Sequence, residues 1–308
     1  MNVVLTLLFY TVRMSTPLLF VIMGGVFVQR AGVFNFALES AINTGAFAAI
    51  AAIMLTGKLW VGVITALIAC VLVNMFFALF TVKFSAHPTV VGMAINLLTA
   101  AIIPYLMMAL FDTSAVINVT STVDPGRMML DVPVLRNIPI LGDIFNLQTP
   151  LTYLSFLMIA VLMVVYYKTT FGTHVRLVGD NWEAAEAIGI NVQKVKIAAL
   201  VISGLCCALA GLNISVESLG MYTLNISASR GYICLSAINC GRKEPGKSAL
   251  FGLLFGFTKA VQIVLSNYLG STLASLLEAL PYITIIVVLV ATELPAVRRN
   301  PMRIFMKG

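Results

Sequence analysis

The chain has 308 residues, of which 60% are hydrophobic and only 10% are charged, and its mean hydropathy is +1.01. Soluble domains are about 45–50% apolar and about 25% charged, so this composition excludes an ordinary soluble protein. The net charge is +7. The basic residues gather at the ends of apolar runs, as the positive-inside rule requires, which argues against a nucleic-acid partner. We expect an all-α, polytopic integral membrane protein that also contacts lipid.

Apolar runs long enough to cross a membrane, about 20 residues each, recur along the whole chain. The first two, 3–28 and 33–55, contain polar or helix-breaking residues, so the number of crossings they make stays open. Clear candidate spans follow at 59–82, 89–111, 150–167, 195–215, 248–267 and 271–294. Residues 231–240 are too short to cross alone. We expect one domain, 1–308, of about eight to ten spans, in which broken or re-entrant helices line a central pathway.

The distribution of Lys and Arg predicts which loops face the cytoplasm. Residues 168–196, residues 241–247 and the C-terminal tail are rich in basic side chains, so these segments should be cytoplasmic. The long polar segment 112–149 holds four aspartates against two arginines and should lie outside. Alternation then makes 231–240 an inward leg. It also places the N-terminus outside, unless residues 1–55 hide a further crossing.

The polar segment 177–194 separates two long apolar runs and has the signals of a short helix. Asp180 or Asn181 can cap its start, and acidic side chains follow in the first turns, where the helix dipole favours them. Gly189 stands where a left-handed residue would end the helix. We therefore predict a short helix that lies flat at the cytoplasmic face.

The surface of this predicted helix is mostly small. Alanines leave it smooth, while Trp182 and Ile188 project as large apolar side chains. Such a shape suits the groove of a partner protein. The alternative is a spacer helix, which would have the same caps but has little need of a tryptophan and an alanine face.

Polar residues also occur inside the second apolar run. Asn35 and Asn43 lie four residues before and after Glu39, so a helix would align all three on one face, and Asn96 lies in a later span. Charged groups inside a bilayer are costly and usually face a cavity or the bundle interior. We expect these four residues to form the pathway wall, with the aromatic ring of Phe34 beside them. The alternative is a hydrogen-bonded cluster between helices.

Three other charged residues, Glu217, Lys259 and Glu278, lie in or beside predicted spans. Glu217 follows the outer end of 195–215 and reads as an ordinary solvated acid. Lys259 would need a partner such as Glu39 or Glu278, since a buried, unpaired lysine is unstable in its charged form.

Several motifs, in order, resemble the permease subunits of ABC importers for branched-chain amino acids, ribose and nucleosides. The motifs are STPLLFVIMGGVFVQRAGVFNFALES, PTVVGMAINLLTAAI, FGTHVRLVGDNWEAAEAIGINVQKVK, GYICLSAINCGRKEPGKSALFGLLFG and LPYITIIVVLV. The AIN and GRxxP versions are similar to the nucleoside or simple-sugar branch. The chain departs from the family pattern at Ser40, Cys240 and Lys259, which bears on the identity of the solute.

The resemblance implies that segment 177–194 is the coupling segment, which docks on an ATPase subunit. The coupling residues would be Asn181, Trp182, Glu183, Ala184, Ala185, Glu186, Ala187 and Gly189. It also implies a second permease subunit, expected to be a paralogue, and an extracytoplasmic solute-binding lipoprotein or protein. The setting would be the bacterial cell (inner or plasma) membrane. A monosaccharide or a branched-chain amino acid is the alternative solute.

Sequence motifs for catalysis are missing from the chain. It has no GxxxxGK[ST] phosphate loop, GxSxG elbow or HExxH pair, so we expect a protein that is not an enzyme and leaves ATP binding to its partner. The five cysteines form no CxxC pair and have no nearby histidines, so neither a metal site nor another cofactor is expected. A gradient-driven secondary transporter or channel is a further alternative, but it would have no use for a docking helix.

Overall fold

The structure is a computed structural model that describes residues 3–113, 115–120, 123, 125–131, 141–266, 277 and 279–299. Of the described residues, 81% are helical. Seven helices of the described part are long and apolar enough to cross a membrane, and a shorter apolar helix covers Leu280–Thr292. The prediction of an all-α, polytopic membrane bundle is confirmed. Glu278 and most of the first half of the predicted span 271–294 lie outside the described residues.

The first half of the chain contains the elements α1 (Val3–Arg30), α2 (Leu38–Thr56), α3 (Leu59–Ala78), the π-helix η1 (Leu79–Lys83), α4 (Pro88–Phe111), β1 (Val116–Asn118), the 3₁₀ helix η2 (Pro125–Met128) and α6 (Leu141–Phe145). The second half contains α7 (Pro150–Lys168), α8 (Thr170–Asp180), α9 (Trp182–Ala187), α10 (Val192–Leu212), the π-helix η3 (Asn213–Leu219), β2 (Met221–Thr223), α11 (Arg230–Cys240), α12 (Pro245–Ser266) and α14 (Leu280–Arg299). The π-helices extend α3 and α10 without a break.

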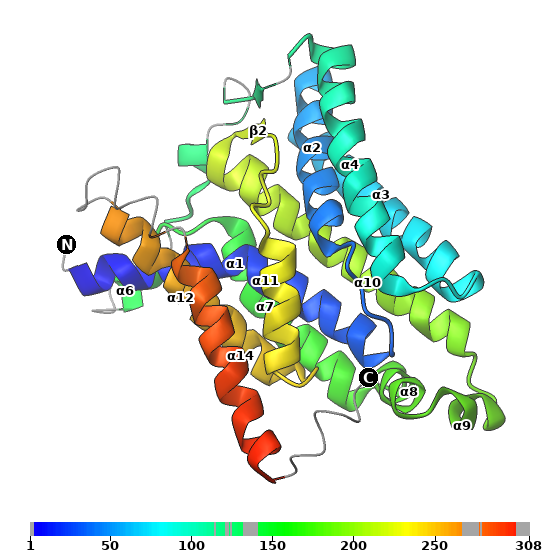
Figure 1. Cartoon of the computed structure of the whole chain (residues 1–308). Helices are drawn as coiled ribbons and strands as arrows, with labels where there is room; N and C mark the ends of the chain where they lie inside the picture. Colours follow the sequence, from blue (N-terminus) through cyan, green and yellow to red (C-terminus); the bar gives the residue numbers. More distant parts are fainter. Residues whose placement is uncertain are drawn as a thin grey trace.

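Helix α1 runs through the middle of the bundle and packs on α7, α10, α11 and α12 (Figure 1). Pro17 and Gly24 do not interrupt it, so residues 3–28 form part of one continuous helix. The reason for the glycine is packing: a Cβ at Gly24 would lie 2.8 Å from Cβ of Cys206 and 2.9 Å from Cα of Ser203. The backbones of α1 and α10 therefore approach closely, which stabilises helix pairs in membranes.

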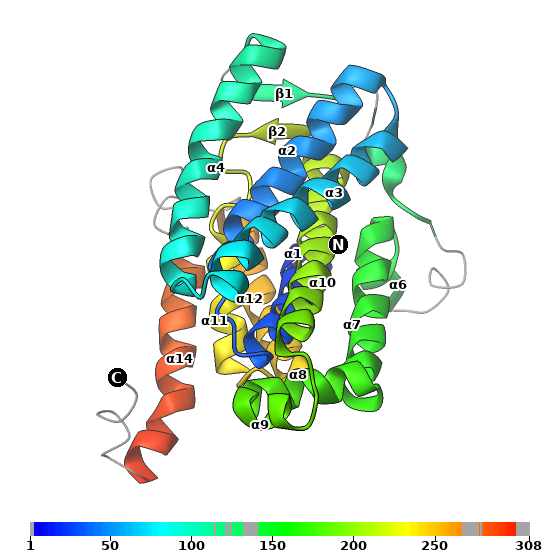
Figure 2. The ribbon, with the colours of Figure 1, turned by 90° about the vertical axis from the view of Figure 1, so that its right-hand side faces the viewer.

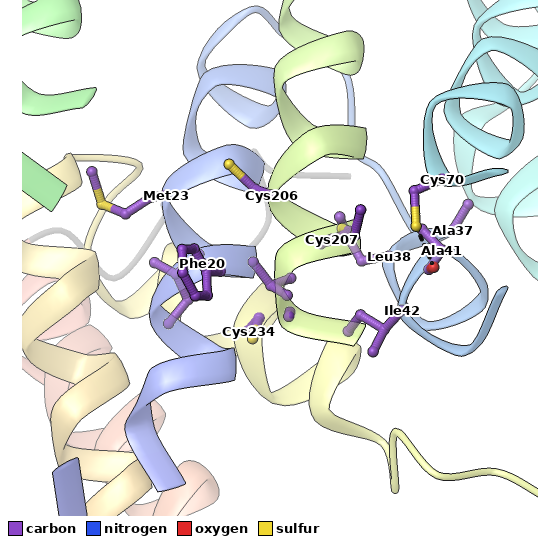
Figure 3. Close-up of a cluster of buried hydrophobic side chains, with 14 of the residues drawn as sticks. Phe20, Met23, Ala37, Leu38, Ala41, Ile42, Cys70, Cys206, Cys207 and Cys234 are labelled. Atoms are coloured by element: carbon purple, nitrogen blue, oxygen red, sulfur yellow. Dashed lines mark hydrogen bonds between the residues drawn. The ribbon is translucent and has the colours of Figure 1, made fainter. Parts of the chain in front are cut away.

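The centre of the bundle is apolar and contains sulfur-bearing side chains from several helices. Figure 3 shows Phe20 of α1, Leu38 of α2, Cys70 of α3 and Cys207 of α10 in one cluster. The Cys70 thiol donates to the carbonyl oxygen of Ala41 at 3.0 Å. All five cysteines of the chain are buried outside any disulfide and act here as small core side chains.

The two ends of the bundle differ in structure. At one end β1 and β2 pair antiparallel, with Val116 opposite Thr223, and at the other end lie α8 and α9 (Figure 2). The described part of segment 112–149 next to β1 therefore lies opposite the basic segment 168–196. This arrangement agrees with the sides predicted from charge. The short helix predicted at 231–240 is present as α11.

Candidate functional site

A pocket of about 450 Å³ opens between α2, α4 and the segment from β2 to α11. It lies where two membrane elements are broken, since α2 begins at Leu38 and α11 begins at Arg230. Its described lining consists of Glu39, Ser40, Asn43, Met93, Asn96, Leu97, Thr99, Ala100, Ile103, Pro104, Tyr222, Leu224, Asn225, Ser229 and Tyr232. Small-molecule sites usually have volumes of about 300–1,000 Å³ and mix an apolar wall with few polar groups. This pocket is the candidate solute site.

Glu39 holds the segment that leads into α11. Its carboxylate accepts hydrogen bonds from the backbone N–H of Ser229 at 2.9 Å and of Gly231 at 2.7 Å, and from the hydroxyl of Ser227. These donors surround the start of α11, where unpaired N–H groups favour a negative charge. Gly231 must lack a side chain, because a Cβ there would lie 2.6 Å from the backbone nitrogen of Glu39. The carboxylate therefore bonds to this segment. The sequence offered either Glu39 or Glu278 as a partner for Lys259, and Glu278 lies outside the described residues.

Asn43 and Asn96 belong to the same arrangement. Asn43 accepts a hydrogen bond from the backbone of Ser227 at 3.2 Å. Asn96 accepts from the backbone N–H of Ser40 at 3.1 Å, and its Nδ2 donates to the carbonyl oxygen of Phe36 at 3.0 Å and to the Tyr232 hydroxyl at 2.9 Å. The structure thus brings together three of the four residues expected on the pathway wall. They line the pocket and also hydrogen-bond its broken segments together, and their role in a solute pathway stays a prediction.

Asn35 and Phe34 lie elsewhere. The expected helix from residue 33 begins only at Leu38, so Asn35 is not on a helix face with Glu39. Its side chain accepts from the backbone N–H of Ala37 at 3.0 Å and donates to Asn74 at 3.0 Å. Asn35 is 1% exposed and outside the pocket lining. Phe34 packs on Phe36, with ring centroids 5.1 Å apart, and is likewise outside the lining.

The charge of the pocket restricts what it can bind. Its described lining contains one carboxylate, that of Glu39, and no lysine, arginine or histidine. No basic side chain of the described lining would pair with an anionic solute. Amides, hydroxyls and the Tyr232 ring remain beside an apolar wall of Met93, Leu97 and Ile103. The arrangement suits an uncharged molecule that has both an apolar face and hydroxyl groups.

The predicted cytoplasmic helix is present as α9, with both of its expected caps. Asn181 accepts a hydrogen bond from the backbone of Ala184 at 3.0 Å. Gly189 has φ of +84°, and the N–H groups of Gly189 and Ile190 bond to the carbonyls of Glu186 and Ala185 at 2.9 and 3.0 Å. This pattern is a Schellman motif. A second helix, α8, precedes α9 and was not predicted, although the N-cap of α8 at Thr169 was visible in the sequence.

The surface of α9 has the shape that the sequence suggested. Ala185 is 2% exposed and anchors the helix, whereas Trp182 is 52% exposed and Ile188 is 69% exposed. The remaining residues of the predicted coupling set are also exposed: Asn181, Glu183, Ala184, Glu186, Ala187 and Gly189. A polar hollow of about 540 Å³ lies beside Trp182, bounded by η1 and the start of α10.

The prediction for Glu217 as a solvated acid is wrong. Glu217 is 5% exposed and lies in η3. Its carboxylate accepts from the backbone N–H of Leu151 at 3.1 Å and from the side chain of Asn213 at 2.9 Å, so it caps the start of α7. The Thr149–Pro150 pair at that start was a usable signal of a helix N-terminus, but its partner comes from 66 residues away.

Comparisons with known proteins agree with this architecture. The family model described as branched-chain amino acid transport system / permease component matches residues 7–292. The chain is 31% identical to the nucleoside ABC transporter permease protein NupC of Lactococcus lactis over 94% of the chain and 93% of that protein. It is 29% identical to the guanosine ABC transporter permease protein NupQ of Bacillus subtilis, over 82% and 81% of the two chains.

A shorter similarity extends to sugar permeases. The chain is 38% identical to the xylose transport system permease protein XylH of Escherichia coli over 31% of the chain and 24% of that protein. No solved structure matches the chain.

Proposed function

Because this chain belongs to the permease-component family of branched-chain amino acid transport systems, and is a multi-pass membrane permease of an ABC importer, we propose that it conducts a nucleoside through the pocket between α2, α4 and α11. Relatives that match most of its length are permeases for nucleosides and guanosine. Two such permease subunits, expected to be paralogues, would together form the pathway, and this chain would contribute half.

The single observation that carries the choice of solute is the pocket lining. A nucleoside is uncharged, with a flat base and a hydroxylated sugar. The base would contact the Tyr232 ring, which is 38% exposed, and stacking of this kind contributes about 1–3 kcal/mol per base in other proteins. Asn43, Asn225 and Ser229 supply polar groups for the sugar hydroxyls. The absence of a basic side chain from the described lining disfavours phosphorylated nucleotides.

The proposed partners follow from the family. An ATPase subunit would dock on α9, with Trp182 as its largest apolar contact, and ATP would be bound by that subunit alone. A solute-binding lipoprotein or protein would deliver the nucleoside at the opposite end, where β1 and β2 lie. We propose no cofactor or metal for the permease itself.

The test is uptake by the complete complex in proteoliposomes, with labelled nucleosides and with ribose, xylose and leucine as competitors. We expect ATP-dependent nucleoside uptake, and we expect that added nucleotides do not inhibit it. Tyr232→Leu should reduce uptake about tenfold, Asn43→Leu less, and Tyr232→Phe least, because it keeps the ring. Asn239→Leu, at an exposed position near the end of α11 and outside the pocket lining, is the control. Uptake of pentoses but not of nucleosides would assign the pocket to sugars, and no ATP-dependent uptake would overturn the proposal.

A further inference from the structure

The last residue of α1 forms an ion pair with the last residue of α8. A guanidinium nitrogen of Arg30 lies 2.8 Å from one carboxylate oxygen of Asp180 and 3.1 Å from the other. The two side chains are 28% and 61% exposed. Such exposed pairs contribute little to stability. The pair nevertheless joins the segment before α9 to a helix 150 residues earlier in the chain.

Beside this ion pair the two backbones touch directly. A Cβ at Gly179 of α8 would overlap the carbonyl oxygen of Arg30. No side chain lies between the helices at this point, so rotamer changes cannot absorb a movement of α8. The ends of α1 and α8 are therefore joined by a rigid backbone contact as well as by the ion pair.

The stiffness continues past the end of α1. Gly32 has φ of +82°, and the N–H groups of Gly32 and Val33 bond to the carbonyls of Gln29 and Val28 at 3.2 and 3.1 Å. Helix α1 thus ends in the same Schellman motif as α9. The chain leaves this motif in a fixed direction toward Asn35.

The connection from α1 to α2, residues 31–37, leads straight to the pocket. Asn35 ties it to Asn74 of α3, and Asn96 of α4 holds the carbonyl oxygen of Phe36. The Phe36 ring lies 6.1 Å from the Tyr232 ring, centroid to centroid. Glu39, which holds the start of α11, follows three residues after Phe36. A displacement of Arg30 would therefore shift the side of the pocket that contains Tyr232.

The end of α1 also carries a polar side chain that this conformation leaves unpaired. Gln29 is 2% exposed, and neither its amide nitrogen nor its amide oxygen has a hydrogen-bond partner among the described residues. Burying such a group without partners is unfavourable. A second conformation of this end of α1, in which the Gln29 amide is hydrogen-bonded to protein or water, would therefore be lower in free energy at this side chain.

From these contacts we infer that the movement of α8 and α9 reaches the solute pocket through Gly179, Asp180 and Arg30, and then through the connection 31–37. Arg30 and Asp180 are positioning residues of the transport cycle. The movement is passed on through this route as well as through α7 and α10, the helices on either side of α8 and α9 in the chain. This inference rests on the proposed function, because it requires an ATPase to act on α9.

The first test compares two ion pairs in the complete complex. Asp180→Asn should lower the solute imported per ATP hydrolysed by up to about fivefold, the upper end of what a part-exposed ion pair supports. The charge exchange Arg30→Asp with Asp180→Arg should restore most of it. Glu244→Gln is the matched control, because the Glu244–Lys247 pair is 2.9 Å long, similarly exposed and confined to one short segment. A purely structural ion pair would leave this ratio unchanged.

The second test separates the two backbones. Gly179→Ala should uncouple hydrolysis from uptake more strongly than Asp180→Asn, because the added carbon pushes α8 off α1. Gly246→Ala is the control, since its Cβ would meet only the flexible end of Met163 at 3.1 Å. Gln29→Met, which removes the unpaired amide, should raise the melting temperature and slow uptake.

A third measurement does not depend on transport. Hydrogen exchange of the whole permease in nanodiscs should show faster exchange in residues 31–37 for Asp180→Asn and Gly179→Ala than for Glu244→Gln and Gly246→Ala. Equal exchange in all four variants, or unchanged coupling in the first two, overturns the inference. If the unmodified complex does not take up nucleosides, the proposed function is contradicted. The hydrogen-exchange data would still decide whether α8 controls residues 31–37.

Discussion

The carboxylate of Glu39 and the backbone N–H of Gly231 are 2.7 Å apart, although they are separated by 192 residues. This contact joins the first turn of α2 to the first turn of α11. Two broken elements of the bundle thus share one buried charge, and the candidate solute pocket lies between them.

Replacing Glu39 should therefore damage the fold around the pocket. Glu39→Ala leaves the N–H groups of Ser229 and Gly231 without an acceptor. We expect the free energy of unfolding to fall by roughly 2–3 kcal/mol, because hydrogen bonds to a buried charge are stronger than neutral ones. Glu39→Gln retains one acceptor and should cost less. Thermal unfolding in detergent measures both, with Glu244→Gln as an exposed control. Equal melting temperatures for all three variants would show that the contact does not stabilise the helix start.

Glu217 should matter in the same way for α7. Glu217→Leu removes the acceptor of the Leu151 N–H and of the Asn213 amide, so we expect lower thermal stability by about 1–3 kcal/mol. The double variant Glu217→Leu with Asn213→Leu removes a donor together with its acceptor and should recover part of this loss. If Glu217→Leu melts like the unmodified protein, the buried position of this carboxylate has no energetic role.

The surface of α9 leads to a prediction about coupling. Trp182→Ala and Gly189→Val should leave the permease inserted but reduce binding-protein-stimulated ATP hydrolysis and uptake, because a half-exposed Trp at an interface can contribute about 2 kcal/mol or more. A β-branched residue at Gly189 would strain the left-handed turn by roughly 1–2 kcal/mol. ATPase and uptake assays on proteoliposomes measure both effects.

Matched controls exist for each of these substitutions. Trp60 is 77% exposed at the start of α3, and Gly57 has φ of +68° with open space around it. Trp60→Ala and Gly57→Val repeat the same changes of side chain far from α9. Normal stimulation and uptake in Trp182→Ala and Gly189→Val would mean that α9 is a spacer.

Membrane sidedness is open to a direct test. In a chain without its native cysteines, an impermeant thiol reagent added from outside should label Asn118→Cys, in β1, and should fail to label Lys243→Cys until the membrane is opened. Both positions are exposed, so burial does not explain a difference. The reverse pattern would contradict the assignment made from the Lys and Arg distribution.

The local features of this protein followed from the sequence, because short-range chemistry decides them. Hydropathy marks spans such as 59–82 and 89–111, and charge bias predicts their sides. A capping side chain and a left-handed glycine, both within a few residues, mark the ends of α9. The family motifs likewise identify a permease without reference to any long-range contact.

Only the tertiary structure decided which polar residues meet. Asn35, four residues before Glu39, was expected on the same helix face, but the helix begins later, and Asn35 bonds to Asn74 in another helix. Glu217 was read as solvated because Leu151, whose N–H it accepts, becomes its neighbour only when α7 packs on η3. The Arg30–Asp180 contact spans 150 residues. Periodicity reports which side chains share one helix, whereas buried polar groups are paired by the packing of several helices.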